Sequence, residues 1–70
     1  MEILVFATSV ASAQEVKTLA PVINKLAGKG NWNFALDDSD HILRIATEQV
    51  DATKAIHLLK QHGFDCRELE

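Results

Sequence analysis

The residues best suited to metal chemistry are the single cysteine, Cys66, and the three histidines, His41, His57 and His62. None has the short spacing, such as Cys-x-x-Cys or His-x-x-x-His, that brings two ligands to one ion. His62 and Cys66 are weak candidates for Zn(II), but they would fill only half of a tetrahedral shell. Alternation along the last strand puts Cys66 on the face of Phe64, which predicts a buried thiol. We therefore expect no cofactor, with copper or zinc as the alternative.

Ser12 and Glu15 offer an alcohol and a carboxylate directly before an apolar helical run. Ser-x-x-Glu in this position is the pattern of a capping box. In such a box the Ser12 hydroxyl accepts from the Glu15 amide, and the Glu15 carboxylate reaches back to the Ser12 amide. We expect this cap to contribute about 1 kcal/mol, helped by the positive end of the helix dipole. The alternative is a site for a hard metal ion or an anion, for which Ser12 and Glu15 are weak candidates.

Composition and motifs argue against two other kinds of chemistry. The chain has 70 residues, a formal net charge of −3 and a pI near 5.5, whereas a nucleic-acid ligand calls for clustered Lys and Arg. The spacing supports no Ser-His-acid or Cys-His arrangement, and no glycine-rich phosphate loop follows the first strand. We expect no nucleic-acid partner, no catalytic residue and no enzymatic activity.

Hydrophobic periodicity predicts six elements that would position these residues. Gly28 and Gly63 are the expected helix stops, and Asp51 can cap the second helix. Pro21 falls inside the first helix, where it removes one backbone hydrogen bond and is expected to bend the axis. In chain order, the predicted strands and helices are Ile3–Thr8, Ala13–Ala27, Asn31–Leu36, Ile42–Ala46, Ala52 towards Gly63, and Phe64–Leu69.

This order of elements predicts an α+β fold of the ferredoxin-like βαββαβ type. A four-stranded antiparallel sheet of order 4-1-3-2, with both helices on one face, satisfies it with two right-handed crossovers. The first and third strands are nearly continuous apolar runs, as central strands should be. The length fits a single domain over residues 1–70.

Several of these features together resemble the heavy-metal-associated (HMA) domain family of copper and zinc carriers. They are the length, the element order, Phe6 near the end of the first strand, the turn at Asp37–Asp40 and the closing Gly63-Phe64. The family carries Met-x-Cys-x-x-Cys after the first strand, where this chain has Val10-Ala11-Ser12-Ala13-Gln14-Glu15. Because Cu(I) selects thiolate and thioether ligands, the resemblance implies a degenerate member without the metal motif.

The resemblance also implies which side of the sheet is uncovered. If Leu4, Phe6 and Thr8 face the helices, their neighbours along the strand face the open side. Trp32 and Phe34 are expected in the core, because they alternate with Asn. Contiguous apolar residues on an open face commonly mark an interface. The interface candidates, together with the neighbouring Ala35, are Ile3, Val5, Ala7, Ile42 and Ala46.

We expect a small non-catalytic binding module that acts through protein contact, with a partner or with itself, at the open sheet face. One alternative is a copper or zinc carrier with unconventional ligands. Another is a small-molecule regulatory domain of the amino-acid-sensing type, although such domains usually have a glycine where Ser9–Ala11 has none. Ile3–Ala7 mimics a signal peptide, but it follows Glu2 rather than Lys or Arg. No run could span a membrane, so a cytoplasmic location is expected.

Overall fold

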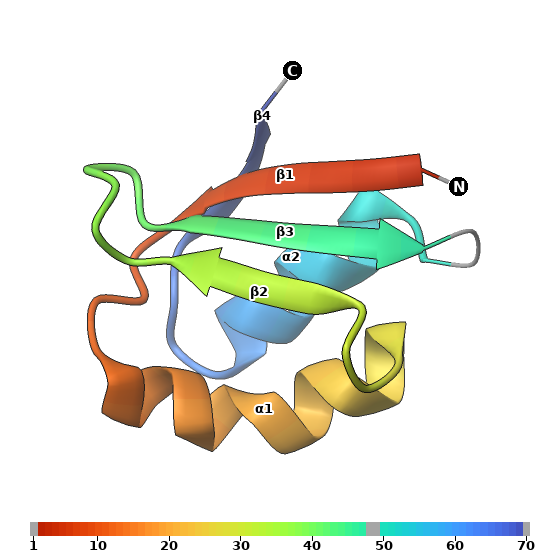
Figure 1. The fold of residues 1–70 in the computed structure, drawn as a ribbon, viewed down its shortest axis with the longest axis horizontal. Helices are drawn as coiled ribbons and strands as arrows, with labels where there is room; N and C mark the ends of the chain where they lie inside the picture. The colour runs from red at the N-terminus through yellow and green to blue at the C-terminus, as the bar shows by residue number, and fades with distance from the viewer. Residues whose placement is uncertain (1, 48–49, 70) are drawn as a thin grey trace.

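The computed structural model describes residues 2–47 and 50–69. Its strands and helices follow one another in the predicted order. Its strands lie antiparallel in the order β2-β3-β1-β4, and both helices pack on one side of the sheet (Figure 1). The ferredoxin-like α+β fold and the 4-1-3-2 sheet are therefore confirmed. The elements are β1 (Glu2–Thr8), α1 (Ala13–Ala27), β2 (Trp32–Ala35), β3 (Ile42–Thr47), α2 (Ala52–Gln61) and β4 (Cys66–Leu69).

The core lies between the sheet and the two helices. Alternation along β1 directs Leu4 and Phe6 inward, and alternation along β3 does the same for Leu43 and Ile45. Trp32 and Phe34 of β2 are half-buried and pack against this cluster, as expected. The largest side chains that are fully buried are Phe6, Val10, Leu19, Ile23, Leu43, Ile45 and Leu59.

Local signals set the helix ends. Helix α1 runs through Pro21 as one element and ends at Gly28, whose N–H donates to the Asn24 carbonyl at 2.9 Å. Gly28 has φ +94°, and a Cβ there would lie 2.8 Å from Asn31 Nδ2, so only glycine fits. The Asp51 side chain caps α2 by accepting from the Lys54 amide at 2.9 Å. The predicted stops and the second cap are thus confirmed.

Two strands are shorter than predicted, each for a backbone reason. Strand β4 begins at Cys66 rather than Phe64, because the Phe64 amide still donates to the Leu59 carbonyl of α2. Strand β2 ends at Ala35 rather than Leu36, because the Ala35 carbonyl accepts from Asp38 and starts the turn. The alternation of apolar residues continues past both strand ends, but the hydrogen bonds between the strands do not.

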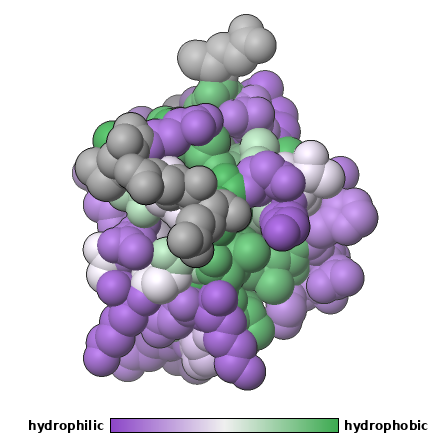
Figure 2. Space-filling model, turned by 90° about the vertical axis from the view of Figure 1, so that its right-hand side faces the viewer, coloured by the Kyte–Doolittle hydropathy of each residue, from purple (hydrophilic) through white to green (hydrophobic). Residues whose placement is uncertain are grey.

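The core approaches the surface at the end of the molecule where α1 ends and α2 begins. Figure 2 looks at this end and shows hydrophobic side chains in the middle of the face, with hydrophilic ones around them. Leu26 of α1 and Ala52 and Ile56 of α2 are among the partly buried residues that pack against the core. Hydrophobic side chains therefore reach the surface at this end of the molecule.

Candidate functional site

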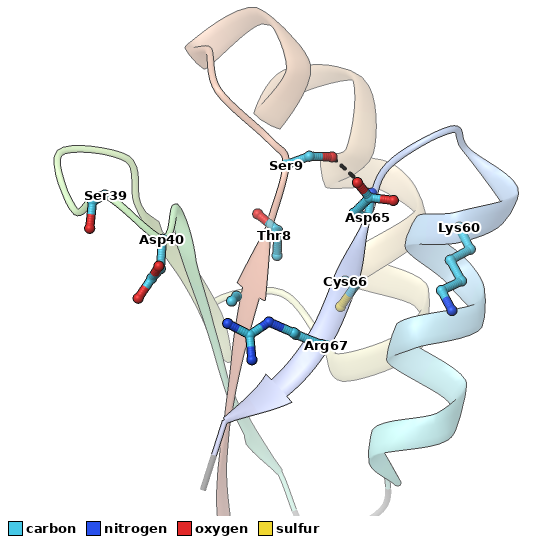
Figure 3. Close-up of a pocket in the computed structure, with 9 residues that line it drawn as sticks. Thr8, Ser9, Ser39, Asp40, Lys60, Asp65, Cys66 and Arg67 are labelled. Atoms are coloured by element: carbon cyan, nitrogen blue, oxygen red, sulfur yellow. Dashed lines mark hydrogen bonds between the residues drawn. The ribbon is translucent and has the colours of Figure 1, made fainter.

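A polar hollow lies where β1 ends beside the starts of β3 and β4. Its volume is about 440 Å³. Strand β1 is antiparallel to both neighbours, so its last residues meet the segments that enter them. Figure 3 shows the charged residues Asp40, Lys60, Asp65 and Arg67 around this hollow. This hollow was not among the predicted sites, although polar residues at three strand ends were a usable signal.

Two of the hydroxyl groups of this hollow, those of Thr8 and Ser9, are engaged by the backbone. Thr8 Oγ1 donates to the His41 carbonyl at 2.7 Å and accepts from the Val10 amide at 3.2 Å. Ser9 Oγ accepts from the Asp65 amide at 2.8 Å (Figure 3). These bonds hold the turn before β3 and the segment before β4 against the end of β1. The two hydroxyls thus have a structural explanation.

The loop between β1 and α1 is built as a helix cap. Ser12 Oγ accepts from the Glu15 amide at 3.2 Å, as predicted. The Glu15 carboxylate does not reach the Ser12 amide, as we expected, but accepts from the Ala11 amide at 2.9 Å. Ser12 has an extended backbone at the N-cap, and the carboxylate satisfies the amide one residue before it. Both side-chain acceptors are therefore used by the backbone.

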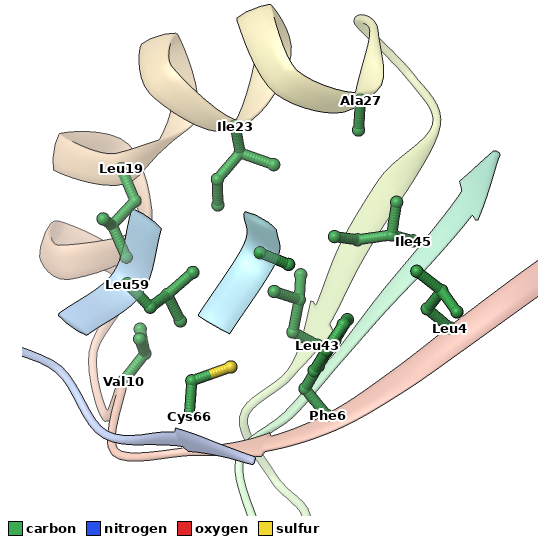
Figure 4. Packing of buried hydrophobic residues seen from close by; sticks show 11 residues of the cluster. Leu4, Phe6, Val10, Leu19, Ile23, Ala27, Leu43, Ile45, Leu59 and Cys66 are labelled. Atoms are coloured by element: carbon green, nitrogen blue, oxygen red, sulfur yellow. The ribbon is translucent and has the colours of Figure 1, made fainter. Parts of the chain in front are cut away.

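The other two metal candidates lie in different surroundings. Cys66 is 6% exposed and packs in the core cluster (Figure 4). His62 is exposed at the end of α2, with its Nδ1 2.9 Å from the Leu58 carbonyl. Across residues 2–47 and 50–69, no three His, Cys, Asp or Glu side chains gather where they could hold a metal ion. The structure therefore does not bring Ser12, Glu15, His62 and Cys66 into one site.

The environment of Cys66 suppresses its ionisation. Burial raises the pKa of the thiol from 9.0 to about 11, and the nearby Lys60 ammonium offsets part of this rise. A buried thiol with a raised pKa is a poor nucleophile and a poor source of thiolate for a metal. Cys66 thus behaves as a small apolar core residue, as the strand alternation predicted.

Cys66 should react slowly with thiol reagents while the chain is folded. At a pH of about 8, the fraction of Cys66 present as thiolate is about 100-fold lower in the folded chain than in the unfolded chain. A thiolate with a higher pKa is a stronger nucleophile, but this restores only part of the reaction rate. We expect a chromogenic aromatic disulfide to react at least about tenfold faster in urea. The neutral thiol also stabilises the fold below pH about 9, and this contribution is lost as the pH rises towards 11.

Cys66→Ala is the control for the pH dependence, because it removes the titrating group and leaves the lysines in place. Its stability should fall less steeply than that of the natural chain between pH about 9 and 11. Equal reactivity in the folded and the unfolded chain would show that the thiol is accessible and would contradict its assignment to the core.

The open face of the sheet carries the predicted interface candidates, but not all of them are exposed. Ile3 is 59% exposed, and Val5 and Ala46 are half-buried. Ala7 and Ile42 are only 9% and 6% exposed, although neither belongs to the core cluster. They lie opposite each other on the two central strands, with a further strand on each side. The exposed apolar surface is therefore centred on Ile3 rather than spread over all five residues.

Both arginines of the chain lie on this open face. Arg44 pairs in register with Val5, and Arg67 pairs with Ala7, so all four side chains leave the sheet on the same side. Both arginines are exposed, and within the described residues neither guanidinium forms an ion pair. The five lysines, in contrast, lie on the helices or in the loop after α1, at Lys17, Lys25, Lys29, Lys54 and Lys60.

Comparisons with protein-family models, curated proteins and solved structures found no match to this chain. Among the described residues, no helix is long and apolar enough to cross a membrane.

Proposed function

We propose that this chain is a small non-catalytic protein-binding module whose contact surface is the open face of the sheet. One observation carries the proposal: both arginines stand on that face, where Arg44 pairs with the half-buried Val5, two residues from the exposed Ile3, and Arg67 pairs with Ala7. Protein interfaces are enriched in arginine and depleted in lysine, and the lysines of this chain are all elsewhere. Arginine is also one of the residues enriched in interface hot spots.

The charge of the face specifies the chemistry of the partner. Arg44 and Arg67 leave the same side of the sheet, where the strand residues paired with them, Asn33, Val5 and Ala7, are neutral; Asp40 lines the hollow that Arg67 also lines. Two copies meeting face to face would bring four guanidinium groups together. The complementary partner is therefore a different protein whose surface combines carboxylates with apolar side chains.

The hydrogen bonds in the loop between β1 and α1 favour a role in protein binding over a role in metal transport. At the two positions where the resembled HMA domains hold thiolates, Ser12 and Glu15 accept hydrogen bonds from the backbone. An alcohol and a carboxylate suit harder ions than Cu(I). We infer an HMA-like layout that works without a soft-metal site. The buried neutral thiol of Cys66 suits a cytoplasmic location, where thiols stay reduced.

The proposal can be tested by selecting displayed random peptides on the natural chain and measuring their affinity for charge-reversed variants. We expect enrichment of peptides that combine Asp or Glu with apolar residues. The double variant Arg44→Glu, Arg67→Glu should weaken their binding at least about 100-fold, because it replaces attraction with like-charge repulsion. The matched control, Lys17→Glu with Lys54→Glu, makes the same change in net charge on the helices and should retain binding.

Amide NMR gives a second readout of where the peptides bind. Shifts should centre on Ile3, Val5, Arg44 and Arg67. Selected peptides that bind the arginine and the lysine variants equally well, or that shift only helix amides, would refute this assignment of the contact face.

A further inference from the structure

Strand β2 forms an edge of the sheet and, apart from its short length, lacks the features that normally protect an edge. Within residues 2–47 and 50–69 it pairs only with β3, and the segment 31–36 reads Asn-Trp-Asn-Phe-Ala-Leu, without a charge or a proline. Natural edge strands usually carry charged residues, prolines or bulges that prevent pairing with another chain. The opposite edge, β4, follows this rule, because it contains Arg67 and Glu68. The two edges of one sheet thus differ in their protection.

The hydrogen-bond pattern of β2 leaves two residues with outward-facing backbone groups. The Ala46 amide donates to the Asn31 carbonyl at 2.7 Å, which makes Asn31 and Ala46 a hydrogen-bonded pair. In an antiparallel ladder such pairs alternate with non-bonded ones. Asn33 and Ala35 therefore bond to β3, and the amides and carbonyls of Trp32 and Phe34 point to the free edge.

The side chains of these two residues are held in place on the helix side of the edge. Trp32 Nε1 donates to Asn24 Oδ1 of α1 at 2.7 Å. The Phe34 ring stands nearly perpendicular to the indole, at a centroid distance of 5.9 Å. A groove of about 450 Å³ separates these rings from the first turns of α1, where Val16 lies. An added strand would find both its hydrogen-bonding groups and its apolar contacts already positioned.

We propose that the occupant of this edge is a second copy of the chain, paired antiparallel through β2 to give a continuous eight-stranded sheet. A two-fold axis at Asn33 sets Trp32 of each copy opposite Phe34 of the other. Their outward amides and carbonyls then exchange hydrogen bonds, and the aromatic rings pair across the strands. The two Asn33 amides meet on the open face.

Charge at the ends of β2 selects a second copy in this orientation. Lys29 precedes the strand and Asp37 follows it, and both are exposed. Both lie in turns, and antiparallel pairing about Asn33 puts the end of β2 that Lys29 precedes in each copy next to the end that Asp37 follows in the other. The strand between them is neutral, so the pairing meets no repulsion along its length. This interface is independent of the arginine-bearing face, which stays free in the dimer.

Sedimentation equilibrium of the full chain, up to about 1 mM, tests the dimer against Asn33→Glu. The new carboxylate gains Arg44 as a neighbour within the chain, so the fold should persist, but it faces its own copy across the axis. We expect the dimer dissociation constant to rise at least about tenfold. The matched control Gln61→Glu makes the same amide-to-carboxylate change on α2 and should leave the constant unchanged.

Amide hydrogen exchange of the natural chain identifies the interface directly. The Trp32 and Phe34 amides should become protected as concentration rises, whereas the Cys66 and Glu68 amides at the other edge should not. A natural chain that stays monomeric throughout, or a dimer whose constant is the same in Asn33→Glu and Gln61→Glu, would overturn the proposal. Loss of the β2 dimer would leave the peptide-binding experiment unaffected.

Discussion

Replacing Ser12 and Glu15 with cysteine is expected to create a Cu(I) site where the natural chain has none. Two thiols three residues apart at a helix N-terminus ionise readily, because the dipole stabilises thiolate. Soft Cu(I) prefers such ligands over an alcohol and a carboxylate. Affinity should change from weaker than about millimolar to tighter than about micromolar, a gain of at least about 1000-fold. Anaerobic competition with a coloured Cu(I) chelator measures it.

Ser12→Ala with Glu15→Ala is the control for this experiment. It removes the same capping groups without adding sulfur, so both double variants should lose about 1–2 kcal/mol of folding free energy in the absence of metal. Only the cysteine variant should then be stabilised by Cu(I). If it binds Cu(I) no better than the alanine variant, the loop lacks the layout of a metal carrier, and the HMA resemblance loses its support.

Phe6→Ala is expected to unfold the domain. The ring is fully buried in the centre of the core, and truncation of a buried phenylalanine costs about 3–5 kcal/mol. A domain of this size has about 3–5 kcal/mol of total stability, so little would remain. Loss of far-ultraviolet circular dichroism and a collapse of amide NMR dispersion would report it.

Ile3→Ala provides the matched comparison, because Ile3 lies on the same strand but on the opposite face and is 59% exposed. It should cost under about 1 kcal/mol. A similar loss of stability in both variants would mean that the two faces of β1 are not divided into core and open side. The proposed contact face depends on that division.

Local patterns were enough to predict the elements and their arrangement. The apolar run from Ala13 ends at Gly28, because only glycine accepts that backbone conformation beside Asn31. Alternation in β1 separates Phe6 from Ile3. The element order then leaves few sheet topologies, and the 4-1-3-2 order is the one observed. Each of these signals acts over a few residues, which is why a single sequence reveals it.

The placing of the arginines and of the polar hollow could not be predicted in the same way, because both depend on the register between distant segments. Arg44 and Arg67 share the open face only because β3 and β4 pair with β1 as they do. The polar hollow likewise needs Ser9 and Asp65 to meet across two strand ends. At the helix cap, the pattern correctly predicted that the Glu15 carboxylate accepts a hydrogen bond from a backbone amide. The predicted donor was the Ser12 amide, whereas the observed donor is the Ala11 amide.

The exposure of the interface candidates illustrates the same limit. Alternation places Ala7 and Ile42 on the open face together with Ile3, yet these two residues of the central strands are only 9% and 6% exposed. Whether an edge strand carries charges or prolines, in contrast, can be judged from the sequence once the strand order is known. The uncharged Asn31–Leu36 is unremarkable as a sequence and becomes informative only at the margin of a sheet.

The start of α1 holds a helix cap, and we propose that it holds no soft-metal site. Anaerobic titration of the natural chain with Cu(I), followed by amide NMR, addresses it most directly. We expect no stoichiometric binding and unchanged Ala11, Ser12 and Glu15 amide signals at equimolar metal. One Cu(I) bound per chain with a dissociation constant below about 1 μM, and amide shifts confined to that loop, would contradict this expectation. The chain would then be a metal carrier.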